Sequence, residues 1–97
     1  MEKTGIKDVV IQEICQLARK YQIEKVILFG SRARGDYKRV SDIDLAVVGG
    51  DFVSFSLDVD EDTSTLLKFD IVNLSGKVQE ELLRSIEEEG VVLYEKI

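Results

Sequence analysis

Residues 26–48 read VILFGSRARGDYKRVSDIDLAVV, a stretch with two apolar runs separated by a polar segment. The first run, 26–29, combines β-branched and aromatic residues without a polar face, which predicts a central strand ending at Gly30. The second run, 43–48, predicts another strand. The polar residues between them, 31–41, are expected to form a loop or one short helix. Strands joined by such segments place the chain in the α/β or α+β class.

The flanking sequence adds helices and strands on either side of this stretch. Apolar residues recur at helical spacing over residues 6–21 and again over 77–89. Short apolar runs at 67–74 and 91–94 predict two further strands. Residues 52–61 are ambiguous, because their apolar residues alternate as in a strand whereas the acidic run at their end, 60–62, disfavours one.

Polar residues and a glycine mark the expected ends of the two longer helices. Thr4 is a candidate N-cap of the first helix and Ser75 of the second. Gly90 is a natural residue to follow the second helix at its C-terminal end. No proline, repeat or low-complexity segment interrupts the 97 residues, so we expect a single domain spanning 1–97.

Composition excludes several classes of function. The apolar fraction of 44% is that of a soluble globular protein, and no apolar run is long enough to span a bilayer, so no membrane partner is expected. The chain has no histidine, which excludes His-ligated zinc, histidine general bases and Ser-His-Asp triads. The single cysteine, Cys15, excludes an internal disulfide and fits a reducing cytoplasm, the expected location.

The distribution of charge narrows the choice of ligand. A net charge of −6 argues against direct DNA binding through the general surface, which needs clustered cations. Four basic residues nevertheless lie close together in the sequence: Arg32, Arg34, Lys38 and Arg39. A local positive patch suits a compact anion such as a triphosphate. Arg32 and Arg34 are therefore candidate nucleotide-binding residues, and a contact with a protein partner is the other role that arginine suits.

Three features of the central strands point to a phosphate-transfer site. Gly30-Ser31 directly follows a strand, so backbone amides and a hydroxyl are presented at a turn that can hold phosphate oxygens. Asp42 and Asp44 lie two positions apart at the start of a strand, which sends both carboxylates to one face. Asp70 interrupts an otherwise apolar strand, where a buried charge needs a partner. Neighbouring carboxylates repel one another unless a cation lies between them, and Mg²⁺ prefers such oxygen ligands.

Gly30-Ser31, ten further residues and Asp42-Ile43-Asp44 together resemble the signature of the DNA polymerase β-like nucleotidyltransferase superfamily. The local sequence LFGSRARGDYKRVSDIDLAV looks like its minimal nucleotidyltransferase branch, the antitoxin partners of HEPN-type ribonuclease toxins. The resemblance covers nearly the whole chain. It implies a small mixed β-sheet of about four strands with helices packed on it, and it implies a helix over 52–61.

The resemblance also implies a role for each candidate residue. Gly30 and Ser31 would bind the β- and γ-phosphates of ATP. Asp42 and Asp44 would hold two Mg²⁺ ions that bridge the triphosphate and the acceptor. Asp70 would ligate the catalytic metal and help to deprotonate the attacking hydroxyl. Two metals that clamp the attacking and leaving oxygens, with charge stabilisation supplying most of the catalysis, are the established logic of such transfers.

Two functions from different classes remain open. At 97 residues the chain lacks the extra domains that hold the acceptor in larger superfamily members, so we expect the acceptor on another macromolecule, and the scarcity of basic surface favours a protein hydroxyl. The first hypothesis is an antitoxin that transfers AMP from Mg-ATP to a tyrosine hydroxyl of a HEPN-type toxin. The alternative is a non-catalytic binding module that neutralises its partner by forming a complex. Transfer to a small molecule is disfavoured, because aminoglycoside-modifying relatives carry an additional helical domain.

Overall fold

The computed structural model describes residues 2–96, in which a short 3-10 helix, η1 (Glu2–Thr4), precedes an alternation of helices and strands. The elements follow in the order α1 (Asp8–Lys20), β1 (Lys25–Phe29), α2 (Ser31–Arg34), β2 (Ile43–Val48), α3 (Phe52–Asp62), β3 (Phe69–Asn73), α4 (Glu80–Glu89) and β4 (Val91–Glu95). No helix within this described part is both long and apolar enough to cross a membrane.

The strands form one mixed sheet in the order β3-β2-β1-β4. β1 pairs in antiparallel fashion with both β2 and β4, whereas β3 pairs with β2 in parallel. A parallel neighbour requires a crossover connection, and α3 supplies it. The four-stranded mixed sheet with helices packed on it confirms the predicted fold class, and β1 occupies the inner position that its unbroken apolar run predicts.

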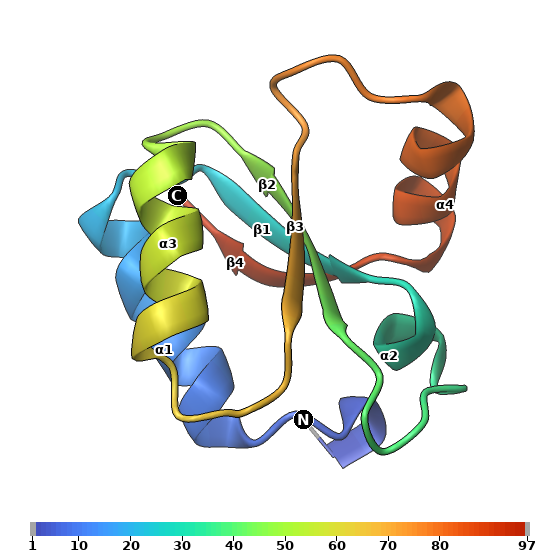
Figure 1. Cartoon of the computed structure of the whole chain (residues 1–97). Helices are drawn as coiled ribbons and strands as arrows, with labels where there is room; N and C mark the ends of the chain where they lie inside the picture. The colour runs from blue at the N-terminus through green and yellow to red at the C-terminus, as the bar shows by residue number, and fades with distance from the viewer. Residues whose placement is uncertain (1, 97) are drawn as a thin grey trace.

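The helices pack on both sides of the sheet. In Figure 1, α1 and α3 lie on one side and α2 and α4 on the other. The larger apolar cluster lies between the sheet and the pair α1 and α3, and it includes Ile14, Leu28, Leu45 and Phe55, all fully buried. A smaller cluster of Phe29, Ala46 and Ile86 lies between the sheet and α4. The α4 side therefore has the thinner cover, and part of this sheet face stays accessible.

The ambiguous segment is helical, which confirms the helix implied by the resemblance. The side chain of Asp51 accepts a hydrogen bond from the Ser54 amide at 3.2 Å and caps α3. Phe55 and Val59, four positions apart, are fully buried. The alternation that suggested a strand arises because other apolar residues of α3, such as Leu57, are exposed to solvent.

The predicted helix ends need correction. Thr4 does not cap α1; it lies in η1, and its hydroxyl accepts from the backbone two residues later. Ser75 does not cap α4 either, because its hydroxyl accepts from the Gly49 amide and α4 begins further along the chain. Gly90 does end α4, but at φ −64° rather than in the left-handed region. Glycine is needed there for space, since a Cβ would lie 2.3 Å from the Ile86 carbonyl oxygen.

Candidate active site

Gly30 connects the end of β1 to the start of α2 in a conformation that only glycine adopts readily. Its φ of 75° and ψ of −156° lie in a region that side chains exclude. A Cβ at this position would also lie 2.2 Å from Oδ2 of Asp44, far inside van der Waals contact. The absent side chain therefore lets the Asp44 carboxylate lie directly against the backbone of the turn.

The helix that follows is a single turn that starts at Ser31 and ends at Gly35. The left-handed Gly35, with φ 93°, closes this turn, and its amide donates to the Ser31 carbonyl at 2.9 Å. The first amides of a helix have no acceptor within it, so they are available to a ligand. A helix of four residues has only a small macrodipole. An anion would therefore be held at this turn by hydrogen bonds from single amides and not by the electric field of the helix.

The carboxylates lie on the face of the sheet that carries α4. In β2, Ile43 and Leu45 are buried in the larger core, so Asp44 between them projects to the opposite face. The parallel register sets Asp44 beside Asp70 on the neighbouring strand, and side chains at paired positions share a face. Asp42 precedes β2 by one residue and follows the same alternation. Asp42, Asp44 and Asp70 are therefore neighbours at one end of two adjacent strands.

Burial and like charge act together on the central carboxylate. Burial, followed by the Asp70 and Asp42 carboxylates, raises the pKa of Asp44, and the Arg34 guanidinium partly offsets the rise. Asp42 and Asp70 themselves are exposed. The prediction that Asp70 is a buried charge is wrong, because β3 is an edge strand and position 70 faces the thinly covered side.

The donor chemistry of the three carboxylates fits a hard divalent cation, since all the ligands are oxygen and their charges repel. In residues 2–96, however, no group of three or more histidine, cysteine, aspartate or glutamate side chains converges closely enough to hold a metal ion. Asp42 and Asp70 are exposed and have room to reorient. The three carboxylates are thus neighbours on one face of the sheet, but their oxygen atoms do not converge on a common metal position.

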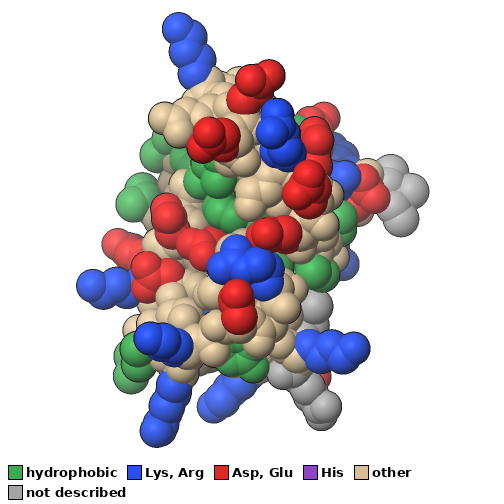
Figure 2. Space-filling view, turned by 90° about the vertical axis from the view of Figure 1, so that its right-hand side faces the viewer, with side chains coloured by type: hydrophobic (Ala, Val, Ile, Leu, Met, Phe, Trp, Pro, Cys, Tyr) green, Lys and Arg blue, Asp and Glu red, His purple; other side chains and the backbone are tan. Residues whose placement is uncertain are grey.

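Arg34 brings positive charge to this face and links two helices. Its guanidinium donates to Asp36 at 3.1 Å and to Glu89 of α4 at 3.0 Å. The contact with Glu89 spans 55 positions, so no sequence signal identified it. Figure 2, which looks onto the side of α2 and α4, shows acidic side chains gathered across the middle of this face with basic ones among them.

Arg32, the other predicted nucleotide-binding arginine, is instead a buried structural residue. It is 2% exposed, and it donates to the carbonyl oxygens of Thr4 at 2.9 Å, Ser41 at 3.0 Å and Arg39 at 3.4 Å. The guanidinium also lies over the Tyr37 ring, 4.8 Å from its centroid. These contacts direct Arg32 into the protein, where it holds the loop before β2, in place of the predicted phosphate contact.

Comparison with known proteins places this geometry in a family. The family model described as "Polymerase beta, Nucleotidyltransferase" matches residues 12–97. A protein of Methanocaldococcus jannaschii named "Putative protein adenylyltransferase MJ0604" is 44% identical, with 80% of this chain and 87% of that protein covered.

Solved structures agree on the fold. A toxin-antitoxin crystal structure with AMP-PNP superposes with a TM-score of 0.72 at 23% identity, covering 89% of this chain and 73% of that one. A crystal structure of a "putative nucleotidyltransferase" from Sulfolobus solfataricus superposes with a TM-score of 0.59 at 23% identity, covering 98% and 86%. Because the family model spans most of the sequence and the M. jannaschii relative is 44% identical, this chain belongs to the polymerase β nucleotidyltransferase family and is a nucleotidyltransferase.

Proposed function

We propose that the protein is an antitoxin that transfers AMP from ATP to a tyrosine hydroxyl of a HEPN-type toxin, with two Mg²⁺ ions as cofactor. The observation that carries the proposal is the pairing of Asp44 and Asp70 on one face, beside the glycine turn at Gly30. The name of the M. jannaschii relative, a protein adenylyltransferase, supports a protein as acceptor. The fold shared with a chain of a toxin-antitoxin structure that contains AMP-PNP supports the partner and the nucleotide.

The turn at Gly30-Ser31 would bind the triphosphate. The amide and hydroxyl of Ser31, the first residue of α2, are hydrogen-bond donors for a phosphate oxygen. Arg34 is exposed and would add a charge-assisted contact to a phosphate by leaving Asp36 or Glu89. Both of those partners are exposed or half-buried, so the exchange costs little.

Asp42, Asp44 and Asp70 would hold the metal ions. Bound Mg²⁺ neutralises charge on the triphosphate and lowers the pKa of a nearby hydroxyl. Asp70 lies on the edge strand β3, where a hydroxyl carried by another protein reaches it without crossing the sheet. Its carboxylate would accept the proton as the hydroxyl oxygen bonds to the α-phosphorus and pyrophosphate leaves. The Asp44 carboxylate, lying against the turn, would link phosphate binding to metal binding.

Label transfer tests this function. The purified protein, Mg²⁺, ATP labelled on the α-phosphate and the protein encoded by the neighbouring gene are incubated together. We expect label on that protein, and we expect its loss with Asp44→Asn and with Asp70→Asn. Asp60→Asn, an exposed aspartate on α3, is the matched control that should keep full activity. Equal labelling by all four proteins would refute the roles given to the carboxylates.

The alternative, a non-catalytic module that neutralises its partner by binding, has one observation in its favour. The carboxylates do not converge on a metal site within the described residues. Under this alternative, Asp44→Asn and Asp70→Asn inhibit the partner's ribonuclease activity as well as the wild-type protein does, and no label is transferred with any nucleoside triphosphate. Measuring inhibition and labelling in the same samples separates the two functions.

A further inference from the structure

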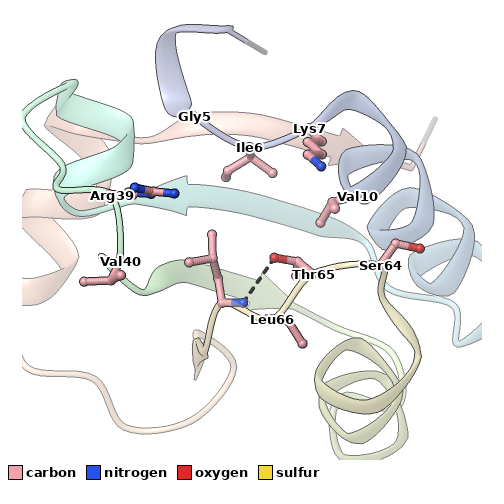
Figure 3. A pocket seen from close by; sticks show the side chains of 10 residues that line it. Gly5, Ile6, Lys7, Val10, Arg39, Val40, Ser64, Thr65 and Leu66 are labelled. Atoms are coloured by element: carbon pink, nitrogen blue, oxygen red, sulfur yellow. Dashed lines mark hydrogen bonds between the residues drawn. The ribbon is translucent and has the colours of Figure 1, made fainter.

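A cavity of about 540 Å³ opens near the start of β2 (Figure 3). Three chain segments meet around it: the residues that lead into α1, the end of the loop before β2, and the connection from α3 to β3. Its lining includes Ile6, Lys7, Arg39, Val40, Thr65 and Leu66. The volume is in the range of cavities that bind ligands or a protruding side chain.

Two exposed apolar side chains lie at the edge of this cavity. Leu66 is 103% exposed and Val40 is 79% exposed, which makes them the most exposed large apolar residues of the described chain. In Figure 3 they lie on two different segments of the cavity wall. Single exposed apolar residues are ordinary, but two of this size at one concave site are typical of an interaction surface.

The cavity continues toward the carboxylates. A second hollow, of about 460 Å³, is lined by the same Val40 and Leu66 together with Asp42 and Lys68. Lys68 is two positions before Asp70 in the sequence. A chain segment that extends from the cavity into this hollow is thus adjacent to Asp42, one of the three proposed metal ligands, without covering the Gly30 turn.

Hydrogen bonds hold the walls in place. The buried Arg32 ties the carbonyl oxygens of Arg39 and Thr4 together, which joins the loop before β2 to η1. On the other wall, the amide and hydroxyl of Ser64 both donate to the Glu13 carboxylate of α1, each at 2.8 Å. A surface that is already ordered loses less entropy when a partner binds.

The rim of the cavity is positive although the protein is acidic. Lys7 and Arg39 line the cavity, Lys68 lines the second hollow, and all three are exposed. None of them takes part in the salt bridges found among residues 2–96. In a chain of net charge −6, two cations at the cavity and a third in the adjoining hollow favour an acidic ligand.

We infer that this cavity docks the acceptor protein, through an acidic segment that inserts an apolar side chain into the cavity and packs against Val40 and Leu66 at its edge. The inserted side chain fills the cavity and carboxylates beside it pair with Lys7 and Arg39. This contact would set the acceptor hydroxyl beside the metal-binding carboxylates. The inference rests on the proposed function, because it assumes that the acceptor is a protein.

Binding and transfer are measured separately to test the inference. Calorimetry gives the Kd for the protein encoded by the neighbouring gene and, in a second titration, for Mg-ATP. Labelling at varied concentrations of that protein gives its KM. We expect Leu66→Glu and Arg39→Glu each to raise this Kd and this KM at least tenfold, with the affinity for Mg-ATP unchanged. Both side chains are exposed, so the variants should fold normally.

Matched controls come from elsewhere on the surface. Leu57→Glu alters an exposed leucine on α3, and Lys77→Glu reverses an exposed charge in the loop before α4. Neither residue lines the cavity, and both variants should bind the partner as the wild-type protein does. Equal weakening by the controls would mean that added negative charge, and not the cavity, is responsible, and it would overturn the inference.

The outcomes separate the inference from the proposed function. Partner binding that Leu66→Glu weakens, without any label transfer, supports docking and refutes the transferase function. Label transfer with unchanged Kd and KM in Leu66→Glu and Arg39→Glu refutes docking and leaves the function standing. A lower affinity for Mg-ATP in these variants would assign the cavity to the nucleotide, and loss of a homodimer alone would assign it to a second copy; either result overturns the inference. The inference is also overturned if the wild-type protein does not bind the protein encoded by the neighbouring gene.

Discussion

Replacing Gly30 by alanine perturbs the turn on which the proposed phosphate site depends. The backbone at φ 75° and ψ −156° costs a residue with a side chain about 1–3 kcal/mol. The new Cβ would also lie 2.2 Å from Oδ2 of Asp44, and displacing that carboxylate or the turn adds about 1–3 kcal/mol. We therefore expect Gly30→Ala to lower the free energy of unfolding by about 2–6 kcal/mol and to abolish AMP transfer.

A double-mutant cycle separates the backbone cost at position 30 from the steric cost of the contact with Asp44. Asp44→Ala removes the atoms at 2.2 and 3.1 Å and keeps the Asp44 Cβ, which at 3.4 Å is an ordinary contact. In that background Gly30→Ala should cost only the backbone term, so the coupling free energy should be about 1–3 kcal/mol. Gly35→Ala is the matched control, because φ is 93° there but no atom lies within 4 Å of a Cβ. Gly35→Ala should lower the free energy of unfolding by about 1–2 kcal/mol, which is the cost of the left-handed backbone alone.

Urea unfolding followed by circular dichroism measures all of these values. Each variant is first checked for an unchanged slope against denaturant, since a changed slope would show a different denatured or native state. If Gly30→Ala costs no more than Gly35→Ala, or if the cycle gives no coupling with Asp44, then the carboxylate does not lie against the turn and the reasoning fails.

Three further predictions concern stability. Phe55→Ala empties a fully buried position and should cost about 3–5 kcal/mol in urea unfolding, whereas Leu57→Ala, exposed on the same helix, should change it by less than about 0.5 kcal/mol; similar costs would disprove the assigned face of α3. Arg32→Met leaves three carbonyl oxygens without their donor and should cost about 2–4 kcal/mol, seen as a lower Tm; an unchanged Tm would contradict its structural role. Burial raises the pKa of the Cys15 thiol, so the unfolded chain loses this proton at lower pH than the folded one. Stability should therefore fall as pH rises above about 8.5, and Cys15→Ala should reduce this slope; an identical slope in the variant would count against it.

Local pattern predicted most of the elements. The apolar run at the end of β1 and the helical spacing of α1 act over a few residues, and their signal survives in the sequence. The same holds for Asp42 and Asp44, because the alternation of a strand sets two residues two apart on one face. The segment of α3 misled, since apolar residues on its exposed side imitated a strand, and Thr4 and Ser75 were wrongly predicted as helix caps.

The arrangement between elements had no such local signal. Asp70 was expected to be buried because its strand is apolar, yet burial depends on whether another strand or helix covers it, and β3 is at the edge. Arg32 and Arg34 look alike in the sequence, but one is 2% exposed and bonded to three carbonyl oxygens while the other bridges to Glu89. A contact of Arg32 with a residue 28 positions away and one of Arg34 with a residue 55 positions away contribute to this difference.

The sequence by itself determined the family, the strand-turn-strand unit and the residue types of the site. The tertiary structure alone decided that Asp70 pairs with Asp44, that Asp42 and Asp70 stay exposed, and that Val40 and Leu66 lie at one cavity. The physical reason is range: backbone geometry and side-chain periodicity act within a few residues, whereas parallel pairing and burial depend on which distant segments pack together.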